Sequence, residues 1–287
     1  MWASPAIERL RRLSQIAAGA VALAFALAPI SGCSLIGGTR PPATTAATTP
    51  VAASIAALAQ RDYALHSMQT GAIMQYSAAD GHHFSTHEQI AVVRPTSIRV
   101  EALSPFGATM VLVADGAGQL MIFDPAHNTM LSGGANAATF ERYVRIPMAP
   151  ASAVDLLMGL APDPEELGTP PDSVTEENGM TVVGWRLGDG RIRELGFESG
   201  ELAMVRERDS AGVQRYQVRY TDWRAESGVS FPRKVDAEFP SSRLTLRYEA
   251  PVLNPAVPAS LFVLTPGPAT RQISIDAGAG ATPGSKG

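Results

Sequence analysis

Short runs in which apolar and polar residues alternate dominate the second half of the chain. A side-chain period of two indicates half-buried β-strands rather than helices. The runs cover residues 180–187, 191–197, 202–208, 213–223, 233–239 and 244–249. The turns beside them contain Asn178-Gly179, Gly188-Asp189-Gly190, Ser199-Gly200 and Ala211-Gly212. Since short turns of this kind join neighbouring antiparallel strands, we expect this half of the chain to form a meander.

The first half shows the same period, together with helical patterns. The runs that predict strands cover residues 71–77, 84–93, 97–103, 109–114, 119–123 and 129–131. Helices are predicted at 51–66 and 151–160, with one or two helical turns at 137–144. We expect Ser152 to cap the helix at 151–160, and either Gly159 or the Ala161-Pro162 pair to end it. The predicted fold class is mainly β (α+β), a large curved antiparallel sheet of about eleven strands covered by two or three helices.

Strand parity gives this sheet one apolar face and one face rich in arginine. Arg206 and Arg219 fall on the second face, whereas Arg191 and Arg193 interrupt the first. Two helices are too few to fill a wide concave sheet, so we expect a cavity lined by apolar side chains. A closed and well-filled core fits the same periodicity. The side chains expected to line the cavity are Val100, Met110, Leu112, Leu156, Leu157, Leu160, Trp185, Leu195, Phe197, Tyr216, Val218, Tyr220, Phe239 and Leu246.

The N-terminal residues have the organisation of an export signal. Three arginines between positions 9 and 12 precede an uncharged stretch at 16–30. As a helix this stretch would rise only about 22 Å, less than the roughly 30 Å of a membrane's hydrocarbon core. A basic start followed by a short apolar stretch is typical of a cleaved signal peptide rather than a transmembrane span.

The apolar stretch ends in Ile30-Ser31-Gly32-Cys33, which resembles the lipobox of bacterial lipoproteins. This resemblance implies cleavage before Cys33 and acylation of Cys33, whereas the alternative is a buried cysteine in an uncleaved helix. Ser34 follows in place of Asp, which implies the outer membrane, with the protein facing the periplasm. We therefore expect a signal peptide at 1–32, a lipidated N-terminus and disordered tether at 33–50, one domain at 51–266 and a disordered low-complexity tail at 267–287.

Composition excludes several classes of protein. The 287 residues include 23 Lys+Arg, 27 Asp+Glu and one cysteine. The mild, unclustered negative charge predicts no binding of nucleic acid, and one cysteine excludes internal disulfides and Cys-based zinc sites. His83 and His87 would lie roughly 13 Å apart on a strand, too far to chelate one metal ion. The sequence also has no nucleophile elbow, phosphate-binding loop or dinucleotide fingerprint. We therefore expect that the protein is not an enzyme and that it binds neither a metal ion nor a cofactor.

A tight turn between two apolar strands is the most distinctive short motif. In Ser104-Pro105-Phe106-Gly107, Pro105 fixes φ and Gly107 permits a positive φ. Phe106 at the tip is either folded back or exposed, and the residues alone leave both possibilities open.

Several motifs occur in an order that resembles the LolB family of outer-membrane lipoprotein receptors, within the LolA/LolB superfamily. These are a helix after a lipidated cysteine, a strand meander, the turn at Phe106, a hairpin, Arg145-Ile146-Pro147 and the apolar run 156–160. The motifs cover about residues 65–162. The resemblance implies a half-open barrel whose helices close one side over a hydrophobic cavity for acyl chains. It also implies that the turn at Pro105, Phe106 and Gly107 contacts the membrane, with Phe106 where the family commonly has Leu.

The expected function is that of an outer-membrane-anchored lipoprotein that accepts or inserts lipoproteins or lipids without catalysis. The expected partners are membrane lipid, the acyl chains of lipoproteins and a soluble periplasmic lipoprotein carrier, and the protein is expected to be a monomer. The alternative is a structural or scaffold envelope lipoprotein that binds a protein partner on its apolar loop or exposed strands.

Overall fold

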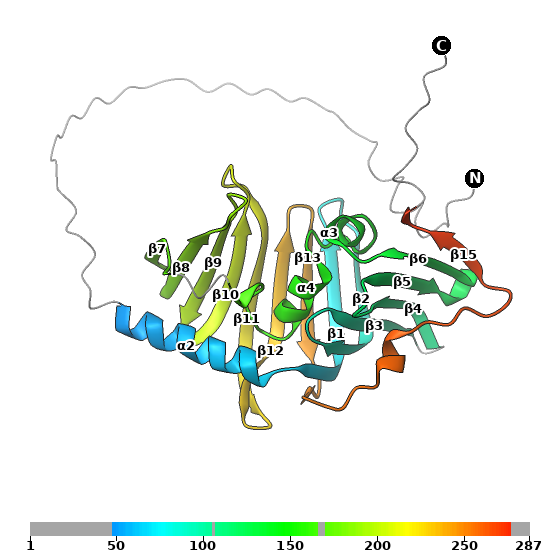
Figure 1. The fold of residues 1–287 in the computed structure, drawn as a ribbon, viewed down its shortest axis with the longest axis horizontal. Coiled ribbons are helices and arrows are strands. Elements are labelled where there is room, and N and C mark those ends of the chain that lie inside the picture. The colour runs from blue at the N-terminus through cyan, green and yellow to red at the C-terminus, as the bar shows by residue number, and fades with distance from the viewer. Residues whose placement is uncertain (1–47, 105–106, 166–169, 277–287) are drawn as a thin grey trace, which may run out of the picture. The chain divides into compact units, whose positions relative to one another are not determined.

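Hairpin turns connect the alternating runs into one antiparallel sheet (Figure 1). The computed structural model describes residues 48–104, 107–165 and 170–276. The strands are β1 (Ser67–Ala78), β2 (His83–Val93), β3 (Ser97–Ser104), β4 (Gly107–Ala114), β5 (Gln119–Asp124), β6 (Thr129–Gly134), β7 (Ser173–Glu177), β8 (Met180–Arg186), β9 (Ile192–Glu198), β10 (Glu201–Arg208), β11 (Gln214–Glu226), β12 (Val229–Phe239), β13 (Ser242–Tyr248), β14 (Val252–Leu253) and β15 (Arg271–Ser274).

The two halves of the chain form two meanders that join through β1 and β13. The strand order is β15-β6-β5-β4-β3-β2-β1-β13-β12-β11-β10-β9-β8-β7, and β14 pairs with β1 outside this path. The central pairing is antiparallel and sets Tyr76 opposite Leu244 and Met74 opposite Leu246. The sheet curves without closing, so the predicted fold class of a mainly β, half-open barrel is confirmed.

The expected number of about eleven strands is too low, because the described residues contain fifteen. The additional strands include β7, β14 and β15, which the sequence pattern did not indicate. Strand β15 pairs in parallel with β6, setting Arg271 opposite Thr129 and Ser274 opposite Ser132. Ile275 follows it and is 4% exposed. The predicted disordered tail from residue 267 is therefore wrong as far as residue 276, because these residues complete an edge of the sheet.

Helices lie at one end of the sheet and within its concave side. They are α2 (Thr48–Ala64), α3 (Ala137–Thr139), which continues into the π-helical turn η4 (Phe140–Val144), and α4 (Pro150–Leu157). Short 3-10 turns are η3 (Pro125–His127) and η6 (Ala259–Phe262). The buried Val51, Leu58 and Arg61 of α2, and Leu65 just after its end, recur at helical spacing. Figure 1 shows α2 lying across one end of the strands from β10 to β12.

The ends of α4 follow from proline and glycine. Pro150 occupies the first turn, where its missing N–H costs nothing, and the N-cap residue Ala149 makes no side-chain cap. The prediction that Ser152 caps this helix is therefore wrong. Gly159 ends the helix as predicted, with φ of 69°. The Leu160 N–H bonds the Asp155 carbonyl and the Gly159 N–H bonds the Leu156 carbonyl, which is a Schellman motif.

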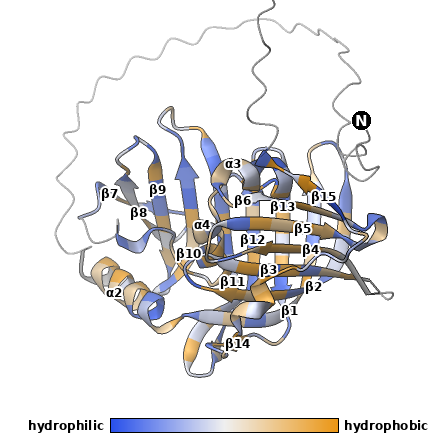
Figure 2. Cartoon of the chain, turned by 45° about the vertical axis from the view of Figure 1, so that its right-hand side comes forward, coloured by the Kyte–Doolittle hydropathy of each residue, from blue (hydrophilic) through white to orange (hydrophobic). Residues whose placement is uncertain are grey.

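Apolar side chains gather on both faces of the sheet. Figure 2, coloured by hydropathy, shows hydrophobic segments along many of its strands. The main core lies on the concave face and includes α4 together with residues from β1–β6 and β8–β13. A second cluster lies on the other face of β2–β5, where Phe262 of η6 covers Ala91, Val111 and Val113. The C-terminal segment therefore protects a surface of the first meander that would otherwise be exposed.

Candidate functional site

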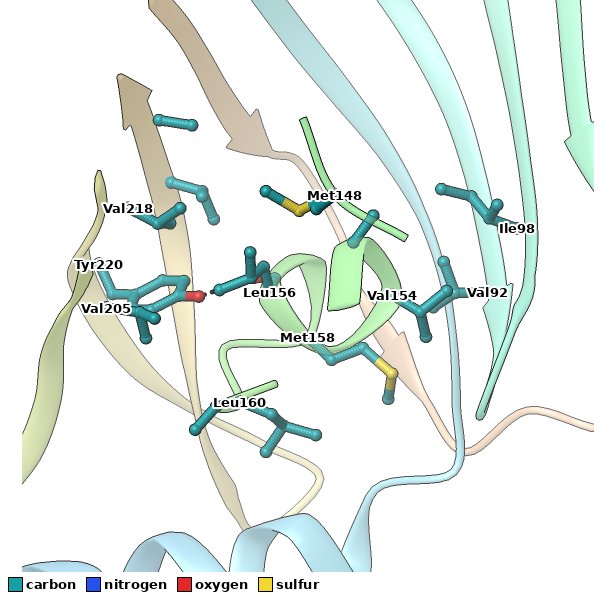
Figure 3. Close-up of a cluster of buried hydrophobic side chains, with 14 of the residues drawn as sticks. Val92, Ile98, Met148, Val154, Leu156, Met158, Leu160, Val205, Val218 and Tyr220 are labelled. Atoms are coloured by element: carbon teal, nitrogen blue, oxygen red, sulfur yellow. Dashed lines mark hydrogen bonds between the residues drawn. The ribbon is translucent and has the colours of Figure 1, made fainter. Parts of the chain in front are cut away.

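The helix α4 lies inside the concave face, between the two meanders (Figure 3). Val205, Val218 and Tyr220 lie on one side of it, and Val92 and Ile98 lie on the other. Val154 and Leu156 of this helix, and Met158 and Leu160 just after it, are at most 5% exposed. This short, apolar helix therefore fills the centre of the half-barrel, where the sequence predicted a cavity.

Three side chains hold the C-terminal end of α4 by its backbone carbonyls. The Tyr220 hydroxyl donates to the Leu156 carbonyl at 3.0 Å, and the Tyr248 hydroxyl donates to the Leu157 carbonyl at 2.8 Å. Arg61 of α2 donates from Nη2 to the Gly159 carbonyl at 2.9 Å. The last carbonyls of a helix lack regular intrahelical partners, so the contacts to Leu157 and Gly159 supply donors to such carbonyls. Tyr220 adds a second donor to the Leu156 carbonyl, which also accepts from the Gly159 N–H.

Two arginines connect α2 to α4. Arg61 pairs with Glu201 at 3.0 Å and lies 4.7 Å from the Trp223 ring, and burial lowers the pKa of its guanidinium. Arg94 donates from Nε to Asp155 at 2.9 Å and from Nη2 to Asp62 at 2.6 Å. A displacement of α4 out of the concave face would therefore break contacts with α2 as well as with the sheet.

Asp155 is a buried acid at this junction. Burial raises the pKa of its carboxyl from the ordinary 3.8 to about 6, although the nearby Arg94 acts in the opposite direction. Between these two pH values the folded protein binds the proton more tightly than the unfolded chain does. The contribution of Asp155 to stability therefore falls as the pH rises from about 4 to about 6 and is constant above that range.

We expect Asp155→Asn to remove this dependence. The stability of the wild type relative to the variant should fall by about 1–3 kcal/mol between pH 4 and pH 7, because only the wild type must ionise a buried carboxyl. Urea unfolding of both proteins across this range measures the difference. Asp222→Asn, at an exposed pair with Arg224, serves as the control and should show no such trend. A difference that stays flat or grows with pH would contradict the expectation.

A row of four side chains crosses the concave face beside α4. Backbone register sets Trp185 opposite Arg193, Arg193 opposite Glu207, and Glu207 opposite Tyr216. All four are at most 3% exposed. Arg193, which interrupts the apolar pattern of the sequence, thus pairs with a buried glutamate on the neighbouring strand.

Glu207 is the centre of this row. It accepts hydrogen bonds from Arg193 at 2.9 Å and from Arg191 at 2.8 Å, and Arg215 lies 3.4 Å away. Arg193 also donates to the Pro162 carbonyl at 2.9 Å and to Asp163 at 3.0 Å. Since residues 162 and 163 follow α4 directly, the buried charges fix the segment that leads out of the concave face.

The concave face continues past α4 toward the hairpin between β1 and β2. Phe84 shares a face with Ile90 and Val92, is 49% exposed and stacks on Tyr76 with ring centroids 5.0 Å apart. Met110, on the same face of β4 as the buried Leu112, is 43% exposed. Large apolar side chains thus remain accessible on this part of the face, which we call the open section and define by Tyr76, Phe84 and Met110.

The residues predicted to line a cavity, to contact the membrane or to carry lipid divide into three groups. Most of them share one core with α4, either fully buried or partly buried against it: Val100, Leu112, Leu156, Leu157, Leu160, Trp185, Leu195, Phe197, Tyr216, Val218, Tyr220, Phe239 and Leu246. Met110 instead lies in the open section. Pro105, Phe106 and Cys33 lie outside the described residues, and Gly107 is the first residue of β4. The roles of these side chains stay predictions.

A groove of about 620 Å³ lies where the segment after α4 passes α2. Its lining is mainly apolar and includes Ile55, Leu58 and Ala161, with Asp62 and Glu165 as charged members. The helical pattern of α2 was visible in the sequence, but the groove was not, because it depends on the path of the chain after Leu160. No helix among the described residues is both long and apolar enough to span a membrane.

Comparison with known proteins places the fold. No protein-family model and no curated protein matches the sequence. A LolA superfamily protein from Nitrosomonas europaea matches with a TM-score of 0.51 at 13% identity, over 74% of this chain and 97% of that one. The chain has a LolA-like fold. An outer membrane lipoprotein-sorting protein domain from Vibrio parahaemolyticus gives a TM-score of 0.53 at 9% identity, covering 72% and 95% of the two chains. A DUF1329 family protein from Desulfovibrio piger gives 0.50 at 10% identity, covering 75% and 97%.

Proposed function

We propose that this protein is an outer-membrane lipoprotein, anchored through Cys33, that binds acyl chains of lipids or lipoproteins on its concave face and transfers them without catalysis. The observation that carries the proposal is the apolar concave face itself. It runs beneath α4 and extends into the open section, where Phe84 and Met110 are 49% and 43% exposed. The LolA-like fold supports this interpretation, since the matching proteins include one described as a lipoprotein-sorting domain.

Acyl chains would bind by replacing water on this face. Each buried CH₂ group contributes roughly 0.8 kcal/mol, so a chain lying along several strands binds without any charged contact. Transfer to a membrane then moves the chain between two apolar environments and needs no nucleotide. Longer ligands would extend beneath α4, which must shift to admit them. Phe106, at the turn between β3 and β4, would contact the bilayer, and the superfamily role that fits best is a LolB-like receptor of lipoproteins from a soluble carrier.

Met110→Glu tests the binding site. A carboxylate in the open section should weaken binding of a fluorescent fatty alcohol by roughly tenfold or more, because the charge must be desolvated against the acyl chain. Val213→Glu is the control, since Val213 is 62% exposed in the turn between β10 and β11 and away from the concave face. Fluorescence titration of the purified proteins measures both affinities.

Two results would count against acyl-chain binding. A wild-type protein that binds no fatty alcohol would favour the alternative of a scaffold lipoprotein with a protein partner. Equal weakening by Met110→Glu and Val213→Glu would show that the open section is not the binding surface.

A further inference from the structure

Glu88 is a buried carboxylate on the concave face, and no function so far described uses it. On β2 it alternates with Ile90 and Val92, so it faces the same side of the sheet as the main core. Its backbone partners are Ala72 of β1 and Ala102 of β3, and the glutamate is 1% exposed. A charged residue type at an apolar position between two alanines requires an explanation.

The hydrogen bonding of Glu88 is incomplete. Its Oε1 accepts from the Thr86 hydroxyl, whereas its Oε2 is buried and accepts no hydrogen bond from the described residues. The other buried acids of the concave side, Asp155 and Glu207, each form ion pairs with arginines. Glu88 forms none with the basic side chains of the described residues, and burial raises the pKa of its carboxyl. Such a group is costly to the fold unless another donor satisfies it.

The open section lies directly beside this carboxylate. Ala102, the β3 partner of Glu88, pairs on its other side with the half-exposed Met110 of β4. Phe84 and Thr86 precede Glu88 on the same face of β2. A molecule that lies against Phe84 and Met110 therefore has its polar end near Glu88, the only buried acid on this part of the face in the described structure. Because Glu88 is 1% exposed, neighbouring side chains must move to admit that polar end.

We infer that Glu88 binds the ammonium group of an amino lipid whose acyl chain lies along the open section; this inference rests on the proposed function. An ammonium has three N–H donors and a positive charge, so it would supply both the donor that Oε2 lacks and the missing counter-charge. An anionic head group would be repelled by the carboxylate. A neutral hydroxyl would supply one hydrogen bond but no charge, so an alcohol would bind less tightly than an ammonium.

The experiment compares two amphiphiles of equal chain length, hexadecylamine and hexadecanol, as competitors of a fluorescent fatty alcohol. The wild-type protein should bind the amine roughly tenfold or more tightly than the alcohol. Glu88→Gln, which keeps the shape of the side chain but not its charge, should abolish the preference and leave hexadecanol binding unchanged. Glu101→Gln is the matched control, since Glu101 lies on the opposite face of β3 beside Arg99 and should retain the preference. Circular dichroism melts establish that both variants are folded.

Each result has a definite meaning. Equal affinity for amine and alcohol, or a preference that survives Glu88→Gln, overturns the ammonium site while leaving acyl-chain binding intact. If neither amphiphile binds the wild type, both the ammonium site and the proposed function fail.

Discussion

Glu207→Ala is expected to lower the free energy of unfolding by about 3–5 kcal/mol. The carboxylate is 2% exposed and is surrounded by Arg191, Arg193 and Arg215. Its removal leaves these positive charges close together and takes from Arg193, itself 1% exposed, its buried acidic partner on the neighbouring strand. The loss is large because a buried arginine loses its buried counter-charge, rather than because the original pair was strong.

Urea unfolding of the wild type and two variants checks this value. Glu238→Ala is the control, because Glu238 is also a strand glutamate paired with an arginine, but the pair is exposed and should contribute less than about 1 kcal/mol. Hydrogen exchange adds a local measurement: the amides of α4 should exchange faster in Glu207→Ala, since the network fixes residues 162 and 163. Similar destabilisation by the two variants would show that burial of the charge is unimportant.

Gly159→Ala is expected to destabilise the protein by about 2–4 kcal/mol. Gly159 has φ of 69°, which side chains disfavour, and a Cβ atom there would lie 2.7 Å from Cγ of Pro232. The alanine must therefore push α4 or β12 aside. Because the Gly159 carbonyl accepts from Arg61, the same movement would loosen the contact between α2 and α4.

Gly179→Ala separates the effect of backbone strain from the effect of the steric conflict with Pro232. Gly179 has a similar φ of 81°, but nothing lies within 4 Å of an added Cβ, so only backbone strain of about 1 kcal/mol is expected. The difference between the variants in thermal or urea unfolding measures the steric conflict with Pro232. Equal losses would mean that the end of α4 has room to move.

The strands were predictable because their signals are local. Alternation and glycine turns located β1–β6 and β8–β13, and Gly159 marked the end of α4. The strand β15 was missed because four residues in a glycine-, alanine- and proline-rich region carry little periodicity, and its partner β6 is distant in sequence. Ser152 is a plausible cap by residue type, but the helix already starts two residues earlier at Pro150, so Ala149 is its N-cap.

The site was predictable in its apolar parts only. Most predicted cavity residues do face α4, but the sequence could not show whether a helix or a ligand fills the space between them. The sequence shows that Arg193 interrupts the apolar alternation of its strand. It does not show that Glu207 is the partner of Arg193, because strand register decides which residues meet. Glu88 could have been found from the sequence: it occupies an apolar position in the alternation that contains Ile90 and Val92.

The pairing of β1 with β13 sets an order of events during synthesis. The ribosome completes β1–β6 long before β13 emerges, and until then β1 presents unpaired backbone N–H and C=O groups along one side. Contacts between segments so distant in sequence form slowly, so β1 keeps an unpaired edge until β13 has been synthesised and pairs with it. A nascent or truncated chain that stops before Ser242 is therefore prone to aggregate, and shielding it is a task for chaperones until translation has passed Tyr248.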